Sequence, residues 1–136
     1  MTNSQKTEQF GVHLMVDGYG APREVLKDKE ALKKMLVDLP RIMGMHTISD
    51  PLFLEEVGPM NRKDPGGVSG FILIAESHIS FHTFPDRGFV TIDVYTCQNT
   101  LDIDGFERLF KESFQLKNAE IHIQKRGLHY PTENIY

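Results

Sequence analysis

Three short segments in the middle of this 136-residue chain constrain its fold more than any other feature. Residues 71–75, 79–83 and 89–96 are rich in β-branched and aromatic side chains, and short polar segments separate them. This composition is typical of β-strands bounded by turns. The sequence therefore predicts three strands that pair with one another as neighbours in a mainly antiparallel sheet.

The first half of the chain contains signals for a further strand and a helix. Apolar residues alternate across residues 10–16, as in a half-buried strand. Pro22 suits the first turn of a helix, and the apolar stripe of that helix continues until Pro40 ends it. A strand at 45–49 is expected to lead into residues 50–67, a segment rich in proline and glycine that we expect to be flexible.

The second half of the chain completes the pattern. Apolar residues at helical spacing predict a helix over residues 103–114 with Asp102 as its cap, and alternation predicts a closing strand over 120–125. Residues 1–8 are polar and are expected to form a mobile tail. Together these elements predict one domain spanning residues 1–136. Its class is α+β, a two-layer sandwich in which helices cover one face of the sheet.

Composition excludes several classes of function. The net charge is -4 and lysine and arginine do not cluster, whereas a nucleic-acid surface would be basic. The longest apolar stretch, residues 71–75, is far too short to cross a bilayer, and the first residues lack the pattern of a signal peptide. We therefore expect a cytoplasmic protein that binds neither nucleic acid nor membrane.

The tripeptide formed by Glu76, Ser77 and His78 carries the most chemistry in the chain. The Ser77 hydroxyl can attack the carbonyl of Glu76 and convert the amide into an ester, and loss of the Cα proton then expels the upstream piece. The remaining dehydroalanine hydrolyses to a pyruvoyl group, which condenses with an amine and accepts electrons from a breaking carboxylate bond. The alternative interpretation is a polar step between two strands.

The single cysteine and two nearby histidines raise the questions of a working thiol and of a metal site. Cys97 has no partner for an internal disulfide, so it is either a small buried hydrophobic residue or a working thiol. His78 and His82 lie four positions apart, but no third ligand of suitable spacing accompanies them. We therefore expect no metal site.

Four motifs together resemble, in order and spacing, the bacterial S-adenosylmethionine decarboxylases. They are Gly67-Val68-Ser69-Gly70, Glu76-Ser77-His78, His82-Thr83-Phe84-Pro85-Asp86 and Thr96-Cys97. The similarity is looser at residues 13–17 and 125–127. Members of that family are pyruvoyl enzymes of spermidine synthesis, so the resemblance implies a pyruvoyl cofactor made from this chain and S-adenosylmethionine as the substrate.

The resemblance also assigns roles to individual residues. It implies self-cleavage between Glu76 and Ser77, which leaves a β chain of residues 1–76 and an α chain of residues 77–136 that begins with the pyruvoyl group. Ser69 and His82 match positions that assist cleavage, with His82 as the base for the Cα proton. Cys97 matches the proton donor that acts after carbon dioxide leaves.

Substrate contacts are implied at three aromatic or acidic positions. Phe84 and Asp86 match residues that hold the adenosine part in the family, where tryptophan and glutamate are more usual. Phe53 is our assignment for an aromatic residue that stacks on adenine. The chain departs from the family pattern in two places, because the segment at 50–67 is several residues longer and Gln98 replaces the usual glycine after Cys97.

Two alternatives stay open at this point. Relatives of this fold decarboxylate arginine or ornithine with the same cofactor. An uncleaved relative would keep the fold and act as a binding or regulatory subunit, for which the long 50–67 segment is the sequence support.

Strand geometry bears on how the site is assembled. Ser77 and His82 are five positions apart, so a straight strand puts them about 16 Å apart on opposite faces. Ser69 and Ser77 are eight positions apart, about 26 Å in an extended chain. Either a turn folds these pieces together or a second copy supplies some of them across a two-fold interface. The resemblance favours the second option, so we expect a homodimer of cleaved protomers.

Overall fold

One six-stranded antiparallel sheet dominates the computed structural model, which describes residues 9–45 and 53–136. The strands, in chain order, are β1 (Gly11–Tyr19), β2 (Phe53–Val57), β3 (Gly67–Ile74), β4 (Ser77–Phe84), β5 (Phe89–Thr96) and β6 (Asn118–Arg126). Their order across the sheet is β2-β3-β4-β5-β1-β6, and each neighbouring pair is antiparallel. The predicted pairing of the three central strands as neighbours is confirmed.

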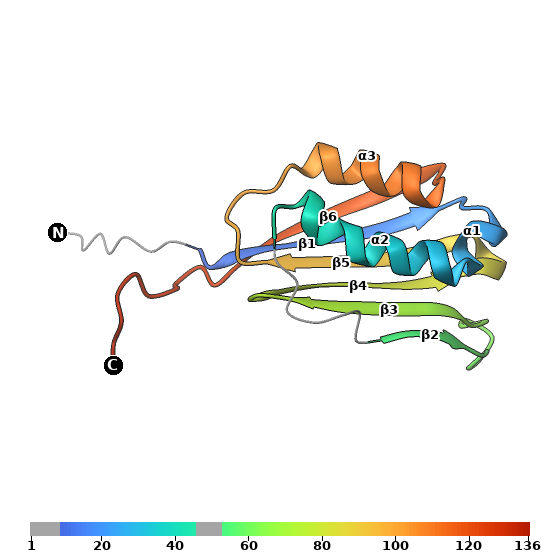
Figure 1. Cartoon of the computed structure of the whole chain (residues 1–136), viewed down its shortest axis with the longest axis horizontal. Coiled ribbons are helices and arrows are strands. Elements are labelled where there is room, and N and C mark those ends of the chain that lie inside the picture. Colours follow the sequence, from blue (N-terminus) through green and yellow to red (C-terminus); the bar gives the residue numbers. More distant parts are fainter. Residues whose placement is uncertain (1–8, 46–52) are drawn as a thin grey trace.

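Helices α1 (Arg23–Lys27), α2 (Lys29–Ile42) and α3 (Ile103–Phe114) all lie on one face of this sheet (Figure 1). A short 3-10 helix, η1 (Pro85–Arg87), joins β4 to β5. We call the face under the helices the core face and the other the open face. The α+β class with helices on one face is therefore as predicted.

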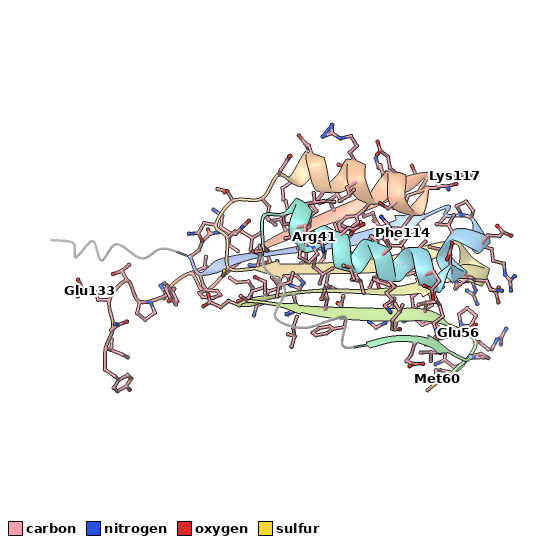
Figure 2. The ribbon with its side chains drawn as sticks, viewed as in Figure 1. Arg41, Glu56, Met60, Phe114, Lys117 and Glu133 are labelled. Atoms are coloured by element: carbon pink, nitrogen blue, oxygen red, sulfur yellow. The ribbon has the colours of Figure 1, made fainter. Side chains whose placement is uncertain are left out.

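The core face is apolar because each central strand turns every second residue toward the helices. Its fully buried side chains include Leu14 on β1, Ile72 on β3, Phe81 on β4 and Ile92 on β5. Phe106, Phe110 and Phe114 recur every four residues on α3 and are buried too, with the Phe114 ring edge-on to Phe81 at 6.3 Å. Figure 2 labels Phe114 and shows the side chains that fill the space between the two layers.

The helical part of the prediction needs two corrections. The single helix expected between Pro22 and Pro40 is divided at Asp28, whose backbone leaves the helical conformation (ψ 87°) so that its carboxylate can accept a hydrogen bond from the backbone N–H of Ala31 at 3.1 Å. Pro40 does not end α2, which continues to Ile42. A proline this close to a helix end removes only its own hydrogen bond, so the last turn survives. The cap predicted for α3 is confirmed, since Asp102 Oδ1 accepts from the N–H of Gly105 at 3.0 Å.

The proline- and glycine-rich segment also differs from the prediction. Residues 53–57 form β2, which extends the sheet by pairing with β3, so this part of the 50–67 segment is a strand rather than a flexible link. Met45 lies outside any strand, and the rest of the strand expected at 45–49 lies outside the described residues, as does the tail at 1–8.

Candidate active site

The turn before Ser77 is tighter than the sequence suggested. Ile74 pairs with Ser77, so the hairpin loop contains only Ala75 and Glu76, and Ser77 and His78 already belong to β4. Glu76 has φ +59°, a left-handed conformation that costs a residue with a side chain about 1–2 kcal/mol. Backbone strain is therefore stored at the residue whose carbonyl precedes Ser77.

Ser77 faces the core and is only 4% exposed. Its Oγ accepts a hydrogen bond from the backbone N–H of Cys97 at 3.2 Å, which links the β3–β4 turn to the end of β5. Cys97 itself is half-buried and directly follows the completely buried Thr96. We refer to Glu76, Ser77 and Cys97 as the cleavage group, because they surround the bond between residues 76 and 77.

Ser69 and His82 form a second cluster. They are directly opposite each other on β3 and β4, and Ser69 Oγ lies 2.7 Å from His82 Nδ1. His82 is exposed and both side chains belong to the open face. We call these two residues the histidine pair.

The histidine pair and the cleavage group of one protomer do not meet. Ser77 and His82 are five positions apart on β4, about 16 Å along a strand, and the two side chains point to opposite faces. The tight turn returns the chain onto Ile74 and does not bring Ser69 to Ser77. The sequence left two arrangements open. The structure does not show the first of them, in which this turn folds Ser69, Ser77 and His82 together.

Two of the three residues assigned to the substrate, Phe84 and Asp86, follow the histidine pair at the same end of β4. The Phe84 ring lies 5.6 Å from that of Phe89, and the two line a hollow together with Tyr19. Asp86 accepts a hydrogen bond from Arg23 Nε at 2.6 Å, and this bond and the charge of Arg23 hold the pKa of the Asp86 carboxyl below its usual range. Phe53, the first residue of β2, pairs through its backbone with Phe71.

Comparisons with known proteins decide the family. A family model described as S-adenosylmethionine decarboxylase matches residues 12–127. The chain belongs to the S-adenosylmethionine decarboxylase family. A protein named S-adenosylmethionine decarboxylase proenzyme from Thermodesulfovibrio yellowstonii is 35% identical over 119 residues, which are 88% of this chain and 82% of that protein. One of the same name from Pyrococcus furiosus is 31% identical over 121 residues, 89% of this chain and 81% of that protein.

A solved structure supports the fold of this family member. It is the adenosylmethionine decarboxylase from Aquifex aeolicus VF5, which is 24% identical and superposes with a TM-score of 0.72 over 94% of this chain and 99% of that one. The resemblance predicted from the four motifs is thus confirmed, and with it the prediction that the chain is an enzyme.

Sequence analysis missed a cluster on the open face of this decarboxylase-family chain. The His78 ring stacks between Phe71 and Tyr95, with ring centroids 5.4 Å away on each side. His13 Nε2 lies 2.9 Å from Asp93 Oδ1, and the Arg126 guanidinium lies 5.0 Å from the centre of the Tyr95 ring. Strand alternation could have placed each residue on this face, but only the register across five strands shows that they meet.

Burial is the main cause that lowers the pKa of His78, and the nearby charges of His13 and Arg126 lower it further while Asp93 acts against them. Among the described residues, no group of three or more histidine, cysteine or acidic side chains is arranged to hold a metal ion. No helix in the described part of the chain is long and apolar enough to span a membrane.

Proposed function

We propose that this chain cleaves itself between Glu76 and Ser77 and then decarboxylates S-adenosylmethionine, which would supply the aminopropyl donor for spermidine synthesis. The observation that carries the proposal is the hairpin turn itself. A strained Glu76 stands before a buried serine whose oxygen has a fixed donor, Cys97 N–H, in a chain whose relatives are named proenzymes.

The residues around Ser77 fit a pyruvoyl group made from it. To form such a group, the protein must orient the serine oxygen, and rupture of the preceding peptide bond should relieve backbone strain. The hydrogen bond from Cys97 N–H orients Ser77 Oγ, and rupture of the 76–77 bond releases the strain at Glu76. Once formed, the pyruvoyl group supplies an electron sink for the bond that breaks to the substrate carboxylate.

In the proposed cleavage, Ser77 Oγ attacks the carbonyl carbon of Glu76 and the C–N bond breaks. A base then removes the Cα proton of Ser77, and the Cβ–Oγ bond of residue 77 breaks. This leaves dehydroalanine at residue 77 and a carboxylate at Glu76, which is the end of the β chain. Water converts the new end of the α chain into the keto group and releases ammonia. His82 is our candidate for the base, with Ser69 orienting its ring through the 2.7 Å contact.

Cys97 is our candidate for the proton donor in decarboxylation. The backbone N–H of Cys97 donates a hydrogen bond to Ser77 Oγ, so Cys97 lies beside the residue that reacts, at the end of β5. A thiol that remains protonated can deliver its proton to the substrate carbon after carbon dioxide leaves.

The separation of the cleavage group from the histidine pair supports a shared site. If His82 serves as the base for Ser77, it must come from a second copy, because about 16 Å and the sheet itself separate the two residues within one chain. We therefore propose a homodimer whose two sites each combine Ser77 and Cys97 of one protomer with the histidine pair of the other. Phe84, Asp86 and Phe53 would then contact the substrate at the partner's cleavage group.

Mixed dimers test this arrangement. A chain with Ser77→Ala and a chain with His82→Ala should each be inactive alone. Produced together, they should regain up to about a quarter of wild-type activity, because half of the dimers are mixed and each mixed dimer keeps one complete site. No recovery in isolated mixed dimers would exclude a shared site.

Turnover with purified protein tests the substrate. Release of carbon dioxide from S-adenosylmethionine, lost in Ser77→Ala, is the expected result. Activity on arginine or ornithine alone would replace the substrate and keep the chemistry. An uncleaved chain that binds S-adenosylmethionine without turnover would identify a regulatory relative. The single domain over residues 1–136 and the cytoplasmic location remain predictions.

A further inference from the structure

The proposed function leaves His78 without a role, although it is the neighbour of Ser77. His13, His82 and His122 each have an oxygen partner, which is Asp93 Oδ1, Ser69 Oγ and Asp17 Oδ2 respectively. The His78 ring makes no side-chain hydrogen bond within the described residues 9–45 and 53–136. In the neutral ring, the nitrogen that carries no proton can therefore take one from a bound molecule.

The surroundings of His78 keep the ring neutral and fixed in place. Phe71 on β3 and Tyr95 on β5 stack on it, with interplanar angles of 26° and 39°. The charged and titratable groups that face it are His13 from β1, Asp93 and Tyr95 from β5, and Arg126 from β6. Burial is the main cause that lowers the pKa of His78 below its ordinary value of 6.5, and the Arg126 guanidinium adds to it, so the neutral form of the ring predominates at neutral pH.

The position of His78 matches the direction from which an amine can reach residue 77. On the core face, Ser77 is buried, it pairs with the buried Ile74, and the next β4 residue on that face, Ile79, is buried too, so this side of residue 77 is the packed side. No helix in the described part of the chain lies over the open face (Figure 1). His78 is the first β4 residue on that face, since Ser77 faces the core. A substrate amine that approaches residue 77 from the open face must pass the imidazole.

We propose that His78 is the base that takes a proton from the substrate's ammonium group, an assignment that rests on the proposed function. An α-amino group is largely protonated at neutral pH and cannot attack a carbonyl in that form. Transfer of one proton from the ammonium to the free ring nitrogen leaves imidazolium and a neutral amine, whose lone pair then forms the new bond to carbon 2 of residue 77. A second proton moves from the attached nitrogen to the keto oxygen, and the imidazolium gives its proton to the resulting hydroxyl. The C–O bond then breaks and releases water, which leaves a protonated Schiff base and restores the neutral ring.

The first test compares His78→Asn and His78→Gln with a matched control, His122→Asn. His122 is also a strand histidine, but it lies at the outer edge of the sheet on β6. Denaturing mass spectrometry first gives the fraction of cleaved chain, and kcat/KM per cleaved chain is then measured against pH. Both His78 variants should lose about 100-fold and should no longer show the fall in kcat/KM at acidic pH. The control should keep the wild-type profile.

A second test does not depend on turnover. In Ser77→Ala, which cannot form the keto group, the ring signals of His78 are followed by NMR and assigned by their loss in Ser77→Ala/His78→Asn. Saturating S-adenosylmethionine should lower the pKa of His78 further, because the ammonium donates a hydrogen bond to the neutral ring and its positive charge opposes a second one beside it. 5′-Methylthioadenosine, which lacks the amine, should leave it unchanged. This test decides the question if the His78 variants are not cleaved.

Two outcomes would overturn the inference alone: a cleaved His78→Asn enzyme with the wild-type pH profile, or equal NMR shifts with both ligands. An uncleaved wild-type chain that releases no carbon dioxide would instead contradict the proposed function.

Discussion

Two residues with side chains adopt a left-handed backbone in the described part of the chain, and only one of them precedes the serine that we propose reacts. Glu76 (φ +59°) stands directly before Ser77, whereas Gln115 (φ 52°) caps the end of α3 far along the sequence. Glycine adopts this conformation without strain, so the pair offers a matched comparison of strain beside the bond proposed for cleavage with strain elsewhere.

Glu76→Gly and Gln115→Gly should each raise the free energy of unfolding by about 1 kcal/mol in urea titrations of the Ser77→Ala background. In the chain with Ser77 intact, Glu76→Gly should also slow cleavage, by about fivefold if the released strain assists bond rupture. Gln115→Gly should cleave at the normal rate. Equal cleavage rates in both variants would show that strain at Glu76 plays no part.

The lowered pKa of His78 predicts a pH dependence of stability. Above its ordinary value of 6.5, His78 is neutral in the folded and the unfolded chain, so its titration does not affect stability. As pH falls below 6.5 the unfolded chain binds the proton first, and folding becomes less favourable. Urea midpoints of the Ser77→Ala protein should fall on acidification, and less so with His78→Gln added. An unchanged slope in that double variant would contradict this assignment.

At the scale of elements, α3 forms the outer layer over one end of the core, and its start depends on Asp102. The carboxylate satisfies a backbone N–H that has no partner inside the helix. Asp102→Ala should therefore lower the free energy of unfolding by about 1 kcal/mol, whereas Asp102→Asn, which can still accept the bond, should lose little. Equal losses in both variants would assign the effect to charge rather than to capping.

Local sequence patterns predicted the central strands and α3, because alternation and helical spacing are properties of each segment alone. They failed for β2, which lies among prolines and glycines and is held in place by pairing with β3. At the candidate site, the sequence named the bond that we propose is cleaved and placed Ser77 and His82 on opposite faces of a strand, as the structure has them. It could not show the Ser69–His82 contact or the stacking on His78, since both depend on the register set by a two-residue turn.

At the scale of the whole molecule, a shared site makes activity depend on association. Specific activity should fall when the protein is diluted below the dissociation constant of the dimer, and sedimentation should show monomers under the same conditions. A core variant such as Phe114→Ala serves as the control for loss of folding. Its free energy of unfolding should fall by about 3–5 kcal/mol at concentrations where the wild type remains dimeric. A stable, fully active monomer would rule out the shared site.

Self-cleavage is the claim on which the proposed chemistry rests, and denaturing mass spectrometry of freshly purified, active protein tests it most directly. The account predicts two fragments, residues 1–76 with an ordinary carboxyl end and residues 77–136 with a terminal keto group in place of the serine amine. Catalytically active material that contains only the intact 136-residue chain would contradict it.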